Sequence, residues 1–292
     1  NWDVSQVTDF SQLFNNATSF NQDISSWDVS SGTDFSYMFS DAHSFNQNIS
    51  NWDVSSGTNF SEMFNRAYTF DQDIGNWDVS SGTNFGQMFD QSSFNQNIGN
   101  WNVSSGTDFS YMFRHNSAFN QDLSNWDVSS GTNFYQMFKD ASAFNQDISS
   151  WDVSSGTNFG EMFHTGTSFD QNISSWEVSA GSNLSGMFTN ATAMLSNGWT
   201  ETPHESLFSG VYFNGPSSNI FTSKNDLETV LDLWIGNRNL AISIYGDINT
   251  WDVSQITDLS NLFAGANAFD DDISNWDVSQ VTDFSQLFNN AT

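Results

Sequence analysis

A carboxylate recurs at one fixed position of a repeat, and it is the group in this sequence best suited to binding a cation. It follows the tryptophan of the motif W-[DNE]-V-S, which returns at steps of 25 residues with one step of 24. Ca²⁺ prefers oxygen ligands, so an ion shared between neighbouring carboxylates is one interpretation. The series is Asp3, Asp28, Asp53, Asp78, Asn102, Asp127, Asp152, Glu177, Asp252 and Asp277, and the candidate calcium ligands are Asp28, Asp53, Asp78, Asp127 and Asp152.

The alternative interpretation is structural, and it is the one we favour. A serine stands two residues after each member of the series. Asp side chains accept hydrogen bonds from the backbone N–H or the hydroxyl two residues further on and so stabilise turns. The sequence contains no EF-hand loop and no calcium-binding nonapeptide repeat. We therefore expect no resident cofactor, with calcium as the alternative.

A second polar series mixes Asp with Asn, which weakens like-charge repulsion and keeps a hydrogen-bonding ladder between repeats. Asn21 and Gln22 precede its first member, and their copies predict amide ladders that satisfy the loop backbone. The series is Asp23, Asn48, Asp73, Asn97, Asp122, Asp147, Asn172, Asp247 and Asp272.

No catalytic motif accompanies these polar residues. His43, His115, His164 and His204 occupy unrelated positions of the repeat, and there is no cysteine. G-x-S-x-G and P-loop sequences are absent. Carboxylates repeated in every unit indicate architecture, because a catalytic pair needs a unique environment. We predict that the chain is not an enzyme.

The repeat itself must position these side chains, and Ile49–Gly75 shows one unit. Its first half reads I-x-x-W-x-V, which predicts a short strand, and its second half has the apolar stripe of a two-turn helix capped by Thr58. The strand residues are Ile49, Trp52 and Val54, and the stripe is Phe60, Met63, Phe64 and Ala67. The sequence therefore predicts an α/β solenoid, a leucine-rich-repeat-like stack of 25-residue coils that each hold a strand and a short helix.

Identical residues of stacked units should lie in columns, and these columns are the predicted core. Of the 29 phenylalanines, 26 fall in three columns typified by Phe35, Phe39 and Phe45. One unit cannot bury its apolar side alone, so each must cover the next. The aromatic residues thus predict packing rather than a ligand site.

The charge balance restricts the partners. Five Lys and Arg face 34 Asp and Glu, for a net charge of −29, and the cations are scattered. A nucleic-acid partner is excluded by this balance. No signal peptide and no apolar run long enough to span a membrane is found, so we expect no membrane insertion by this segment.

Four segments are predicted along the chain. Residues 1–193 are repeats, 194–219 form an irregular C-terminal cap at a module junction, 220–250 form an N-terminal capping helix and a first strand, and 251–292 are repeats again. The capping helix should open at Ser223–Asp226 and end at Gly236. The predicted junction residues are Trp199, Phe208, Tyr212, Phe213, Leu227, Leu231 and Trp234.

Residues 1–18 and 275–292 are identical at all 18 positions, whereas neighbouring units differ at many. A second period of 274 residues explains this identity. It predicts that the segment belongs to a longer tandem array of such modules in one continuous chain, and a noncovalent polymer of free monomers is the alternative.

The units F-N-Q-D-I-S-S-W-D-V-S-S-G-T-D-F-S-Y-M-F and the opening N-D-L-E-T-V-L-D-L-W resemble the BspA-like surface-protein repeats, a leucine-rich-repeat-like bacterial family of unknown function. Gly57 and its equivalents stand where that family has Val, and Phe60 and its equivalents where it has Met. The resemblance implies an extracellular or surface-anchored protein, with adhesion the usual suggestion, and brings no catalytic residues.

The expected function is a structural module of a tandem-repeat extracellular fibre or surface protein, joined end to end to copies of itself through cap contacts. The alternative is an adhesin whose Ser/Asp strand face recognises a host glycan, protein or other surface ligand. Recognition needs surface positions that differ between coils, and the near uniformity of W-D-V-S favours the structural role.

Overall fold

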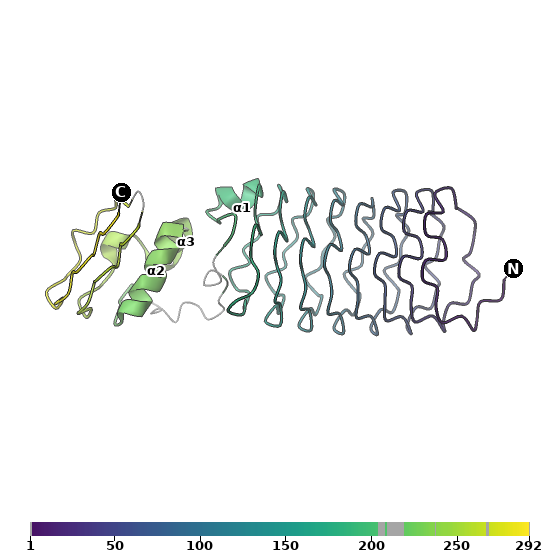
Figure 1. The fold of residues 1–292 in the computed structure, drawn as a ribbon, viewed down its shortest axis with the longest axis horizontal. Coiled ribbons are helices and arrows are strands. Elements are labelled where there is room, and N and C mark those ends of the chain that lie inside the picture. Colours follow the sequence, from purple (N-terminus) through teal and green to yellow (C-terminus); the bar gives the residue numbers. More distant parts are fainter. Residues whose placement is uncertain (1, 204–207, 209–218, 237, 267–268, 292) are drawn as a thin grey trace. The chain divides into compact units, whose positions relative to one another are not determined.

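The computed structural model describes residues 2–203, 208, 219–236, 238–266 and 269–291. The chain divides into two compact units, each described by itself. The first comprises Asn1–Ser196 with Glu201–Phe208, and the second comprises Asn197–Thr200 with Ser209–Thr292. Along the first unit, coils of similar outline lie side by side (Figure 1).

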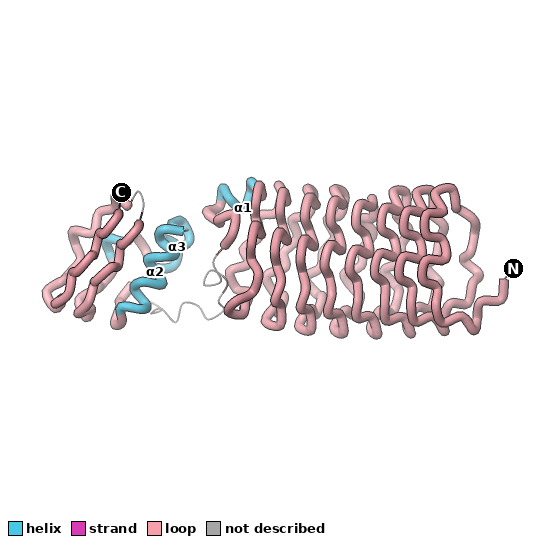
Figure 2. The backbone as a smooth tube through the Cα atoms, viewed as in Figure 1, coloured by secondary structure: helices cyan, strands magenta, loops and turns pink. Residues whose placement is uncertain are grey.

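In the part of the chain that the structure describes, regular helices lie only in the segments where the repeat is interrupted. Helix α1 (Thr192–Ser196) lies in the first unit. The second unit holds α2 (Lys224–Gly236), α3 (Arg238–Tyr245) and the short 3-10 helix η2 (Ile248–Thr250). Within the described residues the repeats contain no named strand and are drawn as turns and loops throughout (Figure 2).

The predicted α/β solenoid of strand-plus-helix coils is therefore wrong. Neighbouring coils are joined by isolated parallel bridges of one residue pair, such as Asn59 with Asn84, and by no continuous sheet. The expected strand fails because its backbone turns twice. Trp52 N–H donates to the Ile49 carbonyl at 3.1 Å, and Gly57 N–H donates to the Val54 carbonyl at 2.8 Å. A chain that reverses at both ends of W-x-V cannot form a ladder.

The predicted two-turn helix is also absent, and a ribbon of reverse turns stands in its place. Met63, Asn65 and Ala67 donate backbone N–H groups three residues back, within the coil. The intervening N–H groups of Phe60, Glu62, Phe64 and Arg66 donate to the carbonyls of Asn84, Gly86, Met88 and Asp90 in the next coil, at 2.9–3.0 Å. A helix would use all of these donors inside one coil, whereas the turns release every second one for stacking.

The ribbon requires left-handed backbone at two positions of each coil. Glu62 and Arg66 have φ of +56° and +54°, because each is the third residue of a turn that reverses the chain. Fourteen further non-glycine residues in seven of the other coils repeat the pair: Gln12, Asn16, Tyr37, Asp41, Gln87, Gln91, Tyr111, His115, Gln136, Asp140, Glu161, Thr165, Gln286 and Asn290. In the remaining two coils Gly186 and Gly265 take one of the two positions, beside Asn190 and Asn261. Side chains rarely adopt this conformation, so the stack must stabilise it.

The predicted apolar columns form the core, although the backbone beneath them differs from the prediction. Phe60, Met63, Phe64 and Ala67 are fully buried. Rings from Phe10 to Phe159 stack with centroids 5.3–5.7 Å apart, and those from Trp52 to Trp176 with centroids 6.2–6.5 Å apart. Each of the inner tryptophans also joins two coils, as when Trp126 Nε1 donates to the Ile98 carbonyl at 3.0 Å. Every coil thus contributes both apolar surface and a hydrogen bond to its neighbour.

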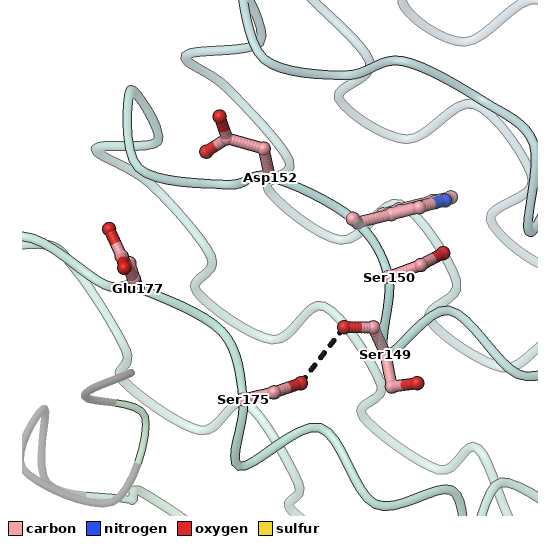
Figure 3. A pocket seen from close by; sticks show the side chains of 6 residues that line it. Ser149, Ser150, Asp152, Ser175 and Glu177 are labelled. Carbon is pink, nitrogen blue, oxygen red and sulfur yellow. Dashed lines mark hydrogen bonds between the residues drawn. The ribbon is translucent and has the colours of Figure 1, made fainter. Parts of the chain in front are cut away.

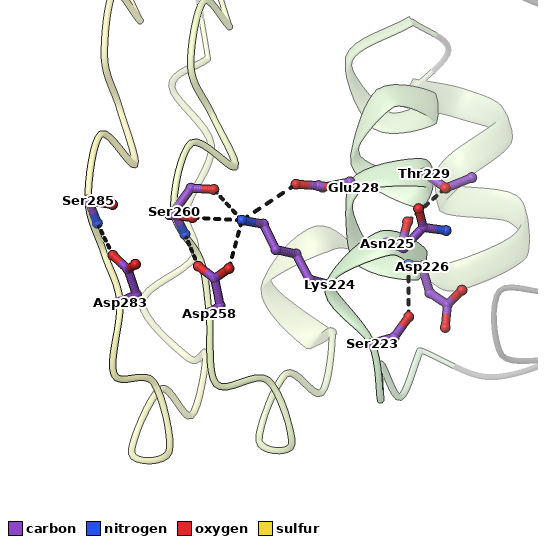
Figure 4. Close-up of polar contacts among 10 residues, drawn as sticks. All are labelled: Ser223, Lys224, Asn225, Asp226, Glu228, Thr229, Asp258, Ser260, Asp283 and Ser285. Atoms are coloured by element: carbon purple, nitrogen blue, oxygen red, sulfur yellow. Dashed lines mark hydrogen bonds and ion pairs between the residues drawn. The ribbon is translucent and has the colours of Figure 1, made fainter.

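In the second unit a helical cap covers the first coil. Helix α2 ends at Gly236 as predicted and buries Leu227, Leu231 and Trp234, and the Trp234 ring meets Trp251 edge-on at 5.5 Å. The segment expected to form a first strand is helical instead, as α3. Lys224 Nζ donates to the Ser260 carbonyl at 2.6 Å and lies 3.1 Å from Asp258 Oδ2 (Figure 4). In interior coils that carbonyl accepts a backbone N–H, so Lys224 replaces the missing neighbour.

Candidate functional site

The recurrent carboxylates after tryptophan form turns of the kind favoured by the structural interpretation. Asp53 Oδ1 accepts the Ser55 backbone N–H at 3.1 Å and its hydroxyl at 2.6 Å. Asp127 makes the same pair of bonds with Ser129. Asp28, Asp78 and Asp152 accept from the serine two residues on as well. The turn interpretation is confirmed for these five aspartates.

These hydrogen bonds stabilise the charged form of the carboxylates. The pKa of Asp28, Asp78 and Asp152 lies below its ordinary value, first because the serine hydroxyl donates to the carboxylate and then because the serine backbone N–H does. All three side chains face solvent, so the effect comes from donors within the turn.

The structure does not bring the five calcium candidates into a shared site. Each lies in its own coil and accepts from its own serine. In the part of the chain that the structure describes, no three His, Cys, Asp or Glu side chains gather closely enough to hold a metal ion. The arrangement is suited to forming turns in a repeating face.

A shallow depression lies on the face that carries this series. It has a volume of about 240 Å³ and is lined by Ser149, Ser150, Trp151, Asp152, Ser175 and Glu177 (Figure 3). Ser175 Oγ donates to the Ser149 carbonyl at 2.9 Å across its floor. Asp152 and Glu177 point along the same side, and Glu177 is the one member of the series with a longer acidic side chain.

The amide pairs form the predicted ladder between coils, whereas members of the second polar series accept hydrogen bonds within their own coil. Asp147 and Asn172 each accept the backbone N–H two residues on, at 2.9 and 3.1 Å. Between coils, Asn120 Oδ1 accepts the Asn145 backbone N–H and Gln146 Nε2, both at 2.9 Å. The ladder satisfies loop backbone that no sheet pairs.

Sequence reasoning missed the side chains that gather on the turn ribbon. Arg114 forms a two-bond ion pair with Asp90, whose side chain is 1% exposed, and its guanidinium lies 4.5 Å from the Tyr111 ring centre. Lys139 Nζ lies 2.6 Å from Glu161 Oε2. The sequence held one clue to this cluster. The residues on the turn ribbon differ from coil to coil, whereas W-D-V-S is nearly constant.

The predicted junction residues are placed in part. Trp199 is buried, and the Phe208 ring stacks on Trp176 with centroids 6.3 Å apart. Leu227, Leu231 and Trp234 belong to α2 and are buried in the second unit. Tyr212 and Phe213 lie outside the described residues.

A search for membrane-spanning helices among the described residues finds no helix with the length and apolar character required. A family model described as Mycoplasma protein of unknown function, DUF285, matches residues 1–93, 83–201 and 218–292. The match confirms that the chain is built from the units of a repeat family, and it does not identify the BspA-like group. No curated protein and no solved structure matches the chain.

Proposed function

We propose that this chain, which belongs to the DUF285 family of Mycoplasma proteins of unknown function, is a structural module of a tandem-repeat extracellular fibre or surface protein. The observation that supports the proposal is the unbroken set of aromatic columns. Rings at equivalent positions stack from the Phe14 coil through to the Phe188 coil with centroids 5.5–5.8 Å apart. A core of this kind resists separation of any one coil from its neighbours.

The side faces of the stack suit the same role. They present short hydroxyl, amide and carboxylate groups that already hydrogen-bond within their own turns. A net charge of −29 opposes lateral association of two such faces. Contact between modules is therefore directed to the ends, where we expect the cap segments to join copies in one continuous chain.

Both caps satisfy the hydrogen bonds that a missing coil leaves open. At the closing cap of the first unit, the Phe188 N–H donates to the Glu201 carbonyl at 2.9 Å and the Gly186 N–H to Thr202 Oγ1 at 2.8 Å. At the opening cap of the second unit, Lys224 Nζ donates to the Ser260 carbonyl. A cap that completes the ladder protects an end from unwanted pairing, as a module boundary requires.

Stretching the chain in an optical trap tests the structural role. Coils that unfold as units should release length in multiples of about 80 Å, the extended length of 25 residues less its folded rise. Smooth extension at low force would contradict the proposal. The covalent array is tested separately under denaturing conditions, because a natural protein of 32.6 kDa would exclude it.

No catalytic activity and no resident cofactor form part of this proposal. Serine hydroxyls of the same turn donate to the carboxylates. Removing calcium with a chelator should therefore leave the melting temperature unchanged, and a clear fall would instead support calcium bound along the series.

The depression around Asp152 and Glu177 favours a second candidate function, an adhesin that binds a glycan or protein ligand on the Ser/Asp face. Glycan-array binding by the whole chain tests it. Binding lost in Glu177→Asp but kept in a matched Asp127→Glu variant would support recognition at this depression. Equal effects of the two substitutions would contradict it.

A further inference from the structure

A hollow on the turn ribbon lies between two neighbouring coils of the first unit. It has a volume of about 260 Å³, and its described lining residues are all polar or glycine. It shares none of them with the depression around Asp152. Pockets for drug-sized ligands are larger and mostly apolar, so this one suits a smaller and more polar group. The lining residues of this ribbon hollow are Glu161, His164, Ser185, Gly186 and Thr189.

Gly186 lacks the long side chain that its counterparts in the preceding coils carry. A Cβ on Gly186 would lie 3.3 Å from Glu161 Cγ and 3.3 Å from Thr189 Oγ1, so a longer side chain would extend among the residues that line the hollow. The left-handed backbone does not account for the glycine, because φ is +61° at Gly186 and +53° to +58° at six counterparts that have side chains. These counterparts are Tyr37, Glu62, Gln87, Tyr111, Gln136 and Glu161.

The carboxylate in the ribbon hollow makes its strong hydrogen bonds through one oxygen. Glu161 Oε2 accepts from Lys139 Nζ at 2.6 Å and from Gln136 Nε2 at 3.0 Å. Donation by Lys139 is the first reason why the pKa of Glu161 lies below its ordinary value. Glu161 Oε1 has a weaker contact, 3.4 Å from the Tyr135 hydroxyl. The ion pair thus carries no net charge and leaves one oxygen able to accept a further hydrogen bond.

Two other groups that line the hollow have unused hydrogen-bonding capacity. His164 Nδ1 lies 2.9 Å from Thr165 Oγ1, which leaves the second ring nitrogen, Nε2. Within the described residues, neither His164 Nε2 nor Thr189 Oγ1 makes a hydrogen bond. A hydroxyl can donate and accept, and an imidazole nitrogen does one or the other according to its tautomer. A carboxylate oxygen, an imidazole nitrogen and a hydroxyl therefore line one small space.

A tyrosine ring lies beside this group. A Cβ on Gly160 would lie 3.1 Å from Tyr135 Cδ2 and 2.6 Å from Asn183 Nδ2, so the ring rests on the backbone of the next coil directly before Glu161. Tyr111 meets Tyr135 edge-on with centroids 5.2 Å apart. Both tyrosines are half-buried. The part of each ring that stays exposed offers an apolar surface with a polar tip.

The lining limits the class of ligand. A cation would find Glu161 already paired with Lys139, and an anion would meet a charged carboxylate on a chain of net charge −29. An apolar anchor of a protein partner needs a well-packed pocket that excludes water, which hydroxyl, imidazole and carboxylate groups do not provide. A neutral group with several hydroxyls can pair with all three of the free atoms.

We propose that the ribbon hollow binds one residue of a neutral sugar chain. The sugar hydroxyls hydrogen-bond to Glu161 Oε1, His164 Nε2 and Thr189 Oγ1. The adjoining sugar packs its C–H side on the Tyr135 ring. The stack of coils thereby carries a carbohydrate site on its variable ribbon, a role beyond that of a structural module.

Binding of the full chain to a glycan array that displays neutral and anionic oligosaccharides tests the site. Calorimetry then measures the affinity for the neutral oligosaccharide that binds most tightly. Gly186→Gln fills the hollow with a side chain that Gln87 and Gln136 carry in the same backbone conformation, and it should weaken binding by about tenfold or more. Thr189→Val keeps the side-chain shape, removes one hydroxyl and should weaken binding by about fivefold.

Glu62→Gln is the matched control, because it places the same side chain at the same ribbon position of another coil, and it should leave the affinity unchanged. Tyr135→Ala should weaken binding of the oligosaccharide but not of the corresponding single sugar. Cooperative thermal unfolding verifies that each variant is folded, and Thr189→Val decides alone if Gly186→Gln does not fold.

Two results would overturn the proposal. One is a wild-type chain that binds no neutral sugar on the array, whether or not it binds anionic ones. The other is binding that survives both Gly186→Gln and Thr189→Val. If Glu177→Asp abolished such binding, recognition would lie at the depression around Asp152 and not at the ribbon hollow.

Discussion

Two coils of the same outline fill the space beside the same turn with different residues. In the coil around Gly131, a Cβ built on the glycine would lie 2.4 Å from Phe134 Cζ and 2.9 Å from the Val128 carbonyl. In the coil around Ile256 the same turn carries a β-branched residue, buried at 2% exposure, and Leu259 stands where the other coil has its phenylalanine. In the coil of Gly131 the absence of a Cβ leaves room for the ring.

A third coil differs in the turn itself. Gly181 has φ of +84°, its turn closes from the Ser182 N–H to the Ser179 carbonyl at 3.1 Å, and a Cβ on Gly181 would meet nothing within 4 Å. Two further coils combine a β-branched residue with phenylalanine, as Val7 with Phe10 and Val281 with Phe284. The comparison teaches that glycine and ring touch in coils such as that of Gly131, where substitution of one should be felt by the other.

Breaking the pair should have the largest effect. Gly131→Val adds a Cβ and two methyl groups against a stacked ring and a carbonyl, and we expect it to lower the free energy of unfolding by about 3 kcal/mol. Adding Phe134→Leu should recover most of this loss. Ile256→Val, the control in the other kind of coil, should cost about 1 kcal/mol. Urea unfolding measures all of them, and no recovery in the double variant would contradict the pairing.

The tryptophan hydrogen bond distinguishes an interior coil from the first coil after the cap. Trp126 Nε1 donates between coils at 3.0 Å, whereas Trp251 Nε1 lies 3.4 Å from Gly246, five residues away. Trp126→Phe removes this donor, while the Ile98 carbonyl keeps the Trp101 backbone N–H at 3.1 Å, and the substitution should cost about 1 kcal/mol beyond Trp251→Phe. Equal losses of unfolding free energy would show that ring area alone matters.

The left-handed positions offer a gain in stability. Thr165 is β-branched and has φ of +56°, where the equivalent position of another coil carries Gly265. Thr165→Gly should raise the free energy of unfolding by about 1 kcal/mol because it removes this strain. Thr167→Gly, in ordinary backbone, should lower it by about 1 kcal/mol. Thermal unfolding of the two variants measures both changes. If both variants changed the free energy of unfolding in the same direction, the backbone strain at Thr165 would be refuted.

Acid should weaken the carboxylate turns by a smaller amount. The pKa of Asp28, Asp78 and Asp152 is lowered in the folded chain, and that of Asp258 falls to about 2 because Ser260 and Lys224 donate to it. A lowered folded pKa gives stability that is present above the ordinary value of 3.8 and is lost as pH falls toward 2. Melting temperatures measured in high salt, which screens the general repulsion, should decline in that window. A melting temperature that stays constant over this pH range would contradict the stabilising role of the carboxylate turns.

The columns could be predicted from the sequence because residue identity decides what is buried, whatever the backbone does. The backbone conformation could not be predicted in this way. Phe60, Met63, Phe64 and Ala67 fit a helix, but tandem turns bury the same four side chains and also free alternate N–H groups for the next coil. The turns require left-handed backbone at two positions of each coil, and residues such as Glu62 adopt it although their type gives no sign of it.

The candidate site, too, could be predicted only in part. The serine two residues after Asp53 was a sufficient cue for its turn. The Asp90 and Arg114 ion pair joins residues 24 positions apart whose pairing depends on the ribbon, a structure the sequence did not reveal. The glycine and phenylalanine pair was visible as Gly57 with Phe60, but its meaning required the distance between them.

Removing one whole coil tests most directly the claim that stability comes from contact between identical residues of adjacent coils. Deleting residues 126–150 brings Trp151 onto Trp101 and restores every column. We predict a folded chain that unfolds cooperatively with a modest loss of free energy, whereas deleting residues 126–137 should abolish cooperative unfolding. Unfolding of the whole-coil variant, or folding of the half-coil variant, would contradict the account.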